Sequence, residues 1–156
     1  DVNDYSFQFK NHKWKFILAK DDDYEKVEKE IPREFDIIFL DTIHKANHVE
    51  KIFYSYYKKL KVGGLFIIDD ISWLYYCKYQ NHDHFHKEIN NKETFLKLLE
   101  IYQSNYENFD IQFCFNDTGC AKIKKLKNNI FKSKKVISRE NSLKNFIRKI
   151  FKTLKF

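Results

Sequence analysis

Glycine, proline and methionine are scarce in this chain of 156 residues, which holds three Gly, one Pro and no Met. So few glycines exclude Gly-rich phosphate-binding loops over most of the chain, and one proline excludes Pro-rich linkers. Because the chain starts at Asp1 and lacks even an initiator Met, we expect an N-terminus that was processed or truncated.

The signals of secretion and membrane insertion are also absent. The three cysteines are odd in number and form no C-x-x-C pair, which argues for a reducing compartment and against a disulfide scaffold. No apolar run exceeds five residues, whereas a membrane-spanning helix needs ~20. The sequence therefore predicts a cytoplasmic location.

Apolar and aromatic residues are plentiful, and the charges are unevenly distributed. The chain is 43% hydrophobic, with 16 Phe and 10 Tyr, so it can bury one core and is not disordered. Residues 1–121 carry 16 basic and 21 acidic side chains, a net charge of −5. Residues 122–156 carry 13 basic and one acidic, a net charge of +12. The basic character therefore belongs to the C-terminal tail.

Short apolar strands alternate with amphipathic helices in the first half of the chain. Continuous apolar runs predict strands at 16–19, 35–40 and 65–68. A helix capped by Asp22 is expected before Pro32, and a second helix follows with an apolar face at Val49, Ile52, Phe53, Tyr56 and Leu60. The pair Gly63-Gly64 is expected to end this second helix. The pattern predicts an α/β fold whose parallel sheet is covered on both faces.

The second half of the domain shows a loop, a helix and a hairpin. Residues 71–90 have no clean periodicity and are predicted to form a long loop that could include a helical turn. Asn90 and Glu93 have the spacing of a capping box for the following helix. Alternating apolar residues on either side of 117–119 predict a β-hairpin over 111–123 that closes the sheet.

Acidic residues follow the predicted strands where those strands end. Asp21, Asp41, Asp69 and Asp70 all occupy such positions, and the carboxyl ends of parallel strands are where ligands bind in open sheets. Three carboxylates brought to one point repel each other unless a cation or a proton neutralises them. Hard oxygen ligands suit Mg²⁺ or a similar ion. The alternative is that these residues cap neighbouring helices and face water.

Two segments carry a family resemblance. FDIIFLDTIH at 35–44, followed by a helix and then KVGGLFIIDDI at 61–71, resembles the second half of a class I S-adenosylmethionine-dependent methyltransferase. The similarity is to its methyltransferase-24-like and metal-dependent O-methyltransferase branches, and it covers roughly 14–125. It implies a Rossmann-like sheet with a C-terminal antiparallel hairpin, in which the first β-α-β segment is missing. Residues 1–125 would be a partial methyltransferase domain and 126–156 a basic amphipathic tail.

The resemblance also implies roles for individual residues. Asp41, Asp69 and Asp70 match the positions that hold a divalent cation in metal-dependent members. His44 matches a general base, and imidazole is suited to proton transfer near neutral pH. The residues that the resemblance assigns to S-adenosylmethionine are Asp1, Lys20, Asp21, Asp22, Asp41 and Thr42. Relatives often carry Gly where this chain has Thr42.

The implied function is methyl transfer from S-adenosylmethionine to an oxygen of a small acceptor, such as a sugar of a surface glycan, assisted by Mg²⁺ or a similar ion. The chain by itself could be inactive. Two alternatives remain open at this point. One is an enzyme of the cephalosporin-hydroxylase kind, which has a similar D-x-x-H and acidic pair. The other is a non-catalytic, membrane-associated interaction module.

The tail contains a basic amphipathic helix. Its apolar residues recur at steps of three and one: Leu143, Phe146, Ile147, Ile150, Phe151 and Leu154. Around them lie Lys144, Arg148, Lys149, Lys152 and Lys155. Segment 138–156 could dock on the domain, lie on an anionic membrane at its inner face, or bind nucleic acid. The continuous apolar stripe disfavours nucleic acid, because phosphate binding requires charge rather than Phe and Ile.

Overall fold

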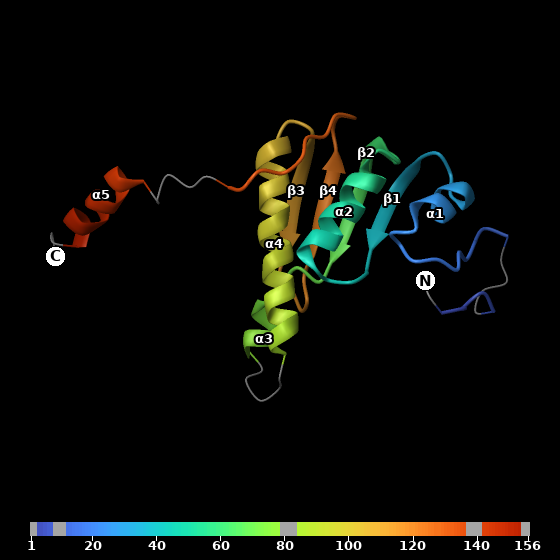
Figure 1. Ribbon diagram of the computed structural model, residues 1–156, viewed down its shortest axis with the longest axis horizontal. Coiled ribbons are helices and arrows are strands. Elements are labelled where there is room, and N and C mark those ends of the chain that lie inside the picture. The colour runs from blue at the N-terminus through green and yellow to red at the C-terminus, as the bar shows by residue number, and fades with distance from the viewer. Residues whose placement is uncertain (1–2, 8–11, 79–83, 137–141, 154–156) are drawn as a thin grey trace.

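A computed structural model describes residues 3–7, 12–78, 84–136 and 142–153 (Figure 1). Its helices are α1 (Tyr24–Glu30), α2 (Ala46–Tyr57), α3 (Leu74–Lys78), α4 (Phe85–Asn105) and α5 (Leu143–Thr153). Its strands are β1 (Phe35–Leu40), β2 (Leu60–Asp69), β3 (Phe109–Cys114) and β4 (Cys120–Lys125). Within these ranges no helix is both long and apolar enough to cross a membrane.

The four strands form one mixed sheet in the order β1-β2-β4-β3. β1 and β2 run parallel, which requires the α2 crossover between them. β4 is antiparallel to both of its neighbours, β2 and β3. The structure thus confirms the α/β fold and the closing hairpin. Because β1 and β2 are parallel neighbours, the loops that follow them lie at the same edge of the sheet.

The core lies between one face of the sheet and the helices α2 and α4 (Figure 1). Phe53 of α2 is fully buried at its centre, with ring centroids 5.2 Å from Phe66 of β2, 5.3 Å from Tyr57 and 5.8 Å from Phe109 of β3. Rings at such distances and tilted angles pack favourably. This aromatic cluster fixes α2 on the sheet, and with it the loop that enters α2.

The opposite face of β1 is not covered by the residues that the structure describes. Ile37 and Phe39 are 58% and 59% exposed, and they align with Leu65 and Ile67 of β2 in the register of the sheet. The prediction of a sheet covered on both faces is therefore wrong for the described part of this chain. β1 is also the edge strand of the sheet.

Three other predicted features differ from the structure near β1 and β2. Residues 16–19 form no strand, since their described hydrogen bonding is a local one from the Ala19 N–H to the Ile17 carbonyl and not to a neighbouring strand. Asp23 rather than Asp22 caps α1, accepting a hydrogen bond from the Lys26 N–H. Gly63 and Gly64 lie inside β2, where the register with β1 shifts.

The start of α4 was also predicted too late. The helix begins at Phe85 and not near Asn90. The segment predicted as a loop, 71–90, also contains the short helix α3. The buried face of α4 includes Asn91 and Thr94, which carry no hydrophobic signal. Asn91 is held there because its Nδ2 donates a hydrogen bond to the Ser72 carbonyl at 2.9 Å.

A buried lysine joins β4 to the end of α2. Lys125 is 1% exposed, and its Nζ donates hydrogen bonds to the carbonyls of Tyr57 at 3.0 Å and Leu60 at 2.5 Å. The amine also lies 4.8 Å from the centre of the Tyr57 ring. Burial lowers the pKa of Lys125 and raises that of Tyr57 to about 12. This contact ties the carboxyl end of α2 to the sheet.

The first part of the tail lies on the domain. The Phe131 carbonyl accepts hydrogen bonds from the Tyr54 hydroxyl and the Asn105 amide. Ser133 donates to the Glu50 carboxylate. These contacts hold 130–134 across α2 and α4. The predicted division of the chain into 1–125 and 126–156 stays a prediction.

Candidate functional site

A histidine lies between two carboxylates where β1 and β2 end. His44 belongs to the loop between β1 and α2, and its Nε2 lies 3.5 Å from Asp41 Oδ1 and 3.2 Å from Asp70 Oδ2. Asp41 directly follows β1, and Asp70 directly follows β2. The Asp41 side chain is 63% exposed, whereas those of Asp70 and His44 are 24% and 27% exposed. The parallel pairing of the strands thus brings together residues far apart in the sequence.

The backbone at Asp70 has an unusual conformation. Its φ is +56°, in the left-handed region that non-glycine residues other than Asn and Asp seldom adopt. Such strain persists only where surrounding structure maintains it, and it is enriched at functional sites. Here the next residues are anchored by hydrogen bonds from the N–H groups of Ile71 and Ser72 to the 118–119 turn. The strained turn directs Asp70 toward His44.

The predicted metal ligands are partly brought together. Asp41 and Asp70 share His44 as a partner, and Asp69 is the last residue of β2, in register with Cys120 of β4. Within the described residues, no group of three or more His, Cys, Asp or Glu side chains is arranged so that it could hold a metal ion. The assignment of Asp41, Asp69 and Asp70 to a metal therefore stays a prediction.

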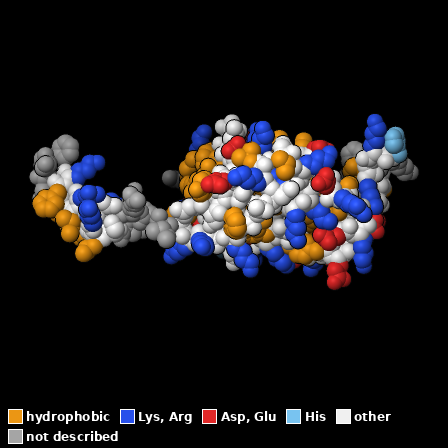
Figure 2. Space-filling model, turned by 90° about the horizontal axis from the view of Figure 1, so that it is seen from above, with side chains coloured by type: hydrophobic (Ala, Val, Ile, Leu, Met, Phe, Trp, Pro, Cys, Tyr) orange, Lys and Arg blue, Asp and Glu red, His pale blue; other side chains and the backbone are white. Residues whose placement is uncertain are grey.

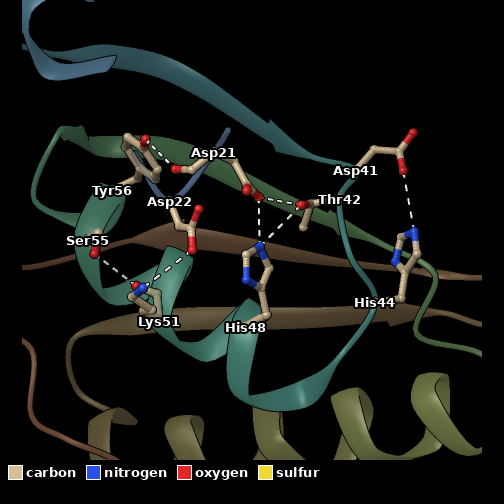
Figure 3. A network of polar contacts seen from close by, with 9 residues as sticks. All are labelled: Asp21, Asp22, Asp41, Thr42, His44, His48, Lys51, Ser55 and Tyr56. Atoms are coloured by element: carbon tan, nitrogen blue, oxygen red, sulfur yellow. Dashed lines mark hydrogen bonds and ion pairs between the residues drawn. The ribbon is translucent and has the colours of Figure 1, made fainter. Parts of the chain in front are cut away.

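A pocket opens beside this cluster. It has a volume of about 490 Å³ and is lined by Ala19, Lys20, Asp21, Asp22, Asp41, Thr42, Ile43 and His48. Figure 3 shows Asp21, Thr42 and His48 meeting at its wall, with Asp41 and His44 on the adjacent turn. Five residues that the sequence assigns to a cofactor, Lys20, Asp21, Asp22, Asp41 and Thr42, line this pocket. The sixth, Asp1, lies outside the described residues.

Asp21 is the best-connected carboxylate of the pocket. Its Oδ2 accepts two hydrogen bonds, one from the Thr42 hydroxyl and one from His48 Nε2 at 2.9 Å. Its backbone carbonyl accepts one from the Tyr56 hydroxyl at 2.8 Å. Burial by itself would raise the pKa of Asp21, but the hydrogen bonds from Thr42 and His48 and the charge of His48 outweigh it, so the pKa is lowered. Asp21 is thus held as a fixed carboxylate.

The neighbouring side chains hold the pocket in shape. Lys51 of α2 lies 3.5 Å from the Asp22 carboxylate and 5.4 Å from the centre of the Tyr24 ring. Burial first, and then the negative charges around it, raises the pKa of Tyr56 to about 12. Its hydroxyl therefore stays protonated and keeps donating to the Asp21 carbonyl. The Lys51–Asp22 ion pair and the Tyr56–Asp21 hydrogen bond therefore attach the loop at 20–22 to α2.

His48 is a site residue that the sequence analysis missed. It lies in the first turn of α2 and its side chain is 16% exposed. One signal could have identified it: a helix that follows a parallel strand has its first turn at the ligand-binding edge of the sheet. The apolar pattern that predicts this helix starts at Val49. It therefore contains no information on the polar first turn, where His48 lies.

Aromatic residues after β2 pack within the protein. Trp73 lies 5.3 Å from the Phe95 ring of α4 and 6.2 Å from that of Phe115. Tyr76 is 7% exposed and lies beside His84. Burial, followed by the charges of Asp70 and other neighbours, raises the pKa of Tyr76. These contacts fix the segment that follows Asp69-Asp70.

Solved methyltransferase structures share this fold. MycE, a methyltransferase from the mycinamycin biosynthetic pathway, was solved with Mg and SAH; it is 22% identical over 83% of this chain, with a TM-score of 0.58. A second MycE structure, with Mg, SAH and mycinamycin VI, is 21% identical with a TM-score of 0.56. SAH-bound PaMTH1 of Podospora anserina is 14% identical over 65% of the chain, with a TM-score of 0.51.

The extent of these matches defines what they establish. The chain covers 36% of each of these two MycE chains and 46% of PaMTH1. No family model and no curated protein matches the sequence. At these identities the comparison establishes the fold: this chain is structurally similar to S-adenosylmethionine-dependent methyltransferases over less than half of their length.

Proposed function

We propose that the protein is an S-adenosylmethionine-dependent O-methyltransferase, assisted by a divalent cation, that acts on a small acceptor such as a sugar. The observation that carries this proposal is the position of Asp41. Asp41 lines the pocket that contains Asp21 and His48, and it also lies beside His44. A methyl donor bound in the pocket would therefore lie next to a side chain that can take up a proton.

The pocket has the polar groups that the donor requires. A nucleoside presents hydroxyls and an exocyclic amine, which donate hydrogen bonds, and Asp21 and Asp22 present acceptors on one wall. Asp21 is already held by Thr42 and His48, so little side-chain freedom is lost when a ligand binds. The MycE and PaMTH1 structures contain SAH, the demethylated form of this donor.

His44 is the residue proposed to take the acceptor proton. Its Nε2 faces the carboxylates of Asp41 and Asp70. An Nε2–H that donates to these carboxylates fixes the orientation of the ring and leaves Nδ1 as the nitrogen that takes the acceptor proton. Asp41, Asp69 and Asp70 offer the hard oxygen ligands that suit Mg²⁺. When bound, such an ion would lower the pKa of an acceptor hydroxyl. The MycE structures contain Mg.

Binding of S-adenosylmethionine is the first test. Titration calorimetry on the full-length protein is expected to show one site, and Asp21→Asn to weaken binding about 10- to 100-fold. This range corresponds to the ~1.5–3 kcal/mol contributed by a hydrogen bond to a charged group. The amide keeps the shape of the carboxylate but has one acceptor oxygen instead of two, so the hydrogen bonds of Thr42, His48 and the ligand compete for it.

Asp110→Asn is the matched control for this titration. Asp110 is an exposed carboxylate on β3, at the opposite edge of the sheet from β1, and its substitution should leave the affinity unchanged. Equal weakening by both substitutions would mean that Asp21 acts only through overall charge. If the full-length protein does not bind S-adenosylmethionine, the proposed function is wrong and a hydroxylase or a non-catalytic module becomes the better hypothesis.

Metal binding is the second test. Titration with Mn²⁺, followed by the electron paramagnetic resonance signal of the free ion, is expected to show a site whose affinity falls at least tenfold in Asp70→Asn. Asparagine tolerates the left-handed backbone of Asp70 (φ +56°), so the substitution removes charge without imposing strain. Loss of one of three carboxylates should have this effect, because charge and ligand number set the affinity for hard cations.

Asp110→Asn again serves as the control and should bind Mn²⁺ as the unmodified protein does. Unchanged affinity in Asp70→Asn would show that these carboxylates are not the ligands.

A further inference from the structure

The C-terminal helix α5 separates its apolar and basic side chains completely. Its five described apolar residues occupy one arc of roughly 140° at 3.6 residues per turn: Leu143, Phe146, Ile147, Ile150 and Phe151. The other arc carries Lys144, Arg148, Lys149 and Lys152, together with Asn145. Within α5 there is no acidic residue. The predicted stripe residue Leu154 lies outside the described residues.

The apolar arc of α5 is exposed. The five side chains are between 45% and 77% exposed, and α5 contacts no other helix or strand within the part of the chain that the structure describes. Figure 1 shows α5 apart from the body of the protein, and Figure 2 shows apolar and basic side chains on its surface. Five large apolar residues on one helix face form a patch that requires a partner.

Local hydrogen bonds at the start of α5 favour the helical form. The Ser142 carbonyl and hydroxyl accept hydrogen bonds from the Asn145 N–H, and the carbonyl also accepts one from that of Phe146. Arg148 donates to the Asn145 side chain at 3.1 Å. A serine at this position is a favoured helix start. These contacts favour the helical form, which separates the two arcs, and insertion of the apolar arc in a bilayer would stabilise it further.

We propose that α5 lies in the surface of an anionic lipid bilayer, with its apolar arc inserted below the headgroups and its basic arc facing lipid phosphates. Both arcs then have a partner, as in other interfacial helices. At 1.5 Å per residue the 11 residues span about 16 Å, which suits a helix lying in the interface plane. A nucleic acid would neutralise the basic arc but leave the apolar arc in water.

Charge confines this contact to the tail. Residues 1–121 have a net charge of −5 and residues 122–156 a net charge of +12, so an anionic surface repels the domain and attracts the tail. The chain leaving the domain is also basic, with exposed Lys132, Lys134 and Lys135. Because 130–134 is bonded to α2 and α4, attachment of α5 tethers the domain to the membrane through residues 135–142.

Vesicle sedimentation of the full-length protein tests the proposal. With phosphatidylcholine vesicles containing phosphatidylserine, the partition coefficient is expected to be at least tenfold higher than with phosphatidylcholine alone, and to fall as salt is raised. The informative variant is I147K/K149I/I150K/K152I, which exchanges residues between the arcs and keeps composition and net charge. It is expected to lose at least tenfold in partitioning, because neither arc remains continuous.

The outcomes separate membrane binding from other partners. Because α5 contacts no other described element, the permuted variant should keep the thermal unfolding temperature of the unmodified protein. Equal vesicle binding by both proteins would overturn the proposal, since charge alone would then explain binding. Failure of the unmodified protein to bind the vesicles would also overturn it. The same holds if the protein binds duplex DNA more tightly than vesicles and the permuted variant still does, or if the unmodified protein is a dimer that the permutation dissociates.

Discussion

Replacing Gly119 by alanine is expected to lower the free energy of unfolding by about 2–5 kcal/mol, measured by urea denaturation. A Cβ at this position would lie 2.6 Å from the Ser72 Cβ and 2.8 Å from the Cys114 carbonyl oxygen, both too close. The backbone φ of +73° adds strain of ~1–2 kcal/mol for a residue with a side chain. Steric overpacking of this kind costs ~1–3 kcal/mol more.

Gly63→Ala is the matched control for this substitution. Gly63 has a similar φ of +85°, but a Cβ there meets no atom within 4 Å. It should therefore cost only the backbone strain, about 1–2 kcal/mol. Equal losses at the two glycines would contradict the close packing of the 116–119 turn against Ser72. That packing matters for the site, because Ser72 follows the Asp69-Asp70 pair by two residues.

The second large effect is expected at Lys125. Lys125→Met should lower the free energy of unfolding by about 3 kcal/mol, because the carbonyls of Tyr57 and Leu60 lose their shared donor in a buried position. Methionine replaces most of the volume of the lysine chain, so the loss measured by urea denaturation reports mainly the missing hydrogen bonds and not a cavity.

The neighbouring lysine supplies the control. Lys124 precedes Lys125 on β4 but is exposed on the opposite face of the sheet, so Lys124→Met should change the free energy of unfolding by less than about 0.5 kcal/mol. Similar small effects in both variants would show that the amine of Lys125 contributes no net stability, as happens when desolvation of a buried charge cancels its hydrogen bonds.

The elements that the sequence predicts best are those with unambiguous apolar patterns. β1 agrees in both bounds, 35–40, because five of its six residues are apolar and charged residues lie on both sides of it. The sequence predicts a helix end at Gly63-Gly64, whereas the two glycines lie in β2 where its register with β1 shifts. Sequence alone does not distinguish a glycine that ends a helix from one at such a shift in strand register. The structure shows why glycine is needed there: a Cβ on Gly64 would lie 2.8 Å from the Asp36 carbonyl oxygen.

The start of α4 and the strand expected at 16–19 show two other limits. α4 buries the polar residues Asn91 and Thr94 against its neighbours, and buried polar residues produce no hydrophobic periodicity. The run at 16–19 is apolar enough for a strand, but a strand needs a neighbour with which to form hydrogen bonds, and the described sheet ends at β1. An apolar pattern shows that a segment prefers to be buried, but it does not show whether a second strand lies beside it to form hydrogen bonds.

The candidate site was predictable in composition and only partly in geometry. The positions of Asp41 and Asp70 follow from the rule that parallel strands present their carboxyl ends at one edge. Asp21 lines the pocket although the segment before it, 16–19, forms no strand. His44 between two carboxylates, His48 on Asp21 and the left-handed backbone of Asp70 depend on loop conformations. Loop conformations are set by contacts distant in sequence, such as the one between Ser72 and the 118–119 turn.

The strand order has a consequence for synthesis on the ribosome. β4 lies between β2 and β3 in the sheet, yet its last residue, Lys125, follows the end of β2 at Asp69 by 56 residues. At ~5–20 residues per second, one edge of β2 waits roughly 3–11 s for its partner during translation. During that interval the nascent chain exposes an unpaired edge of an apolar strand, which is a template for pairing with another chain.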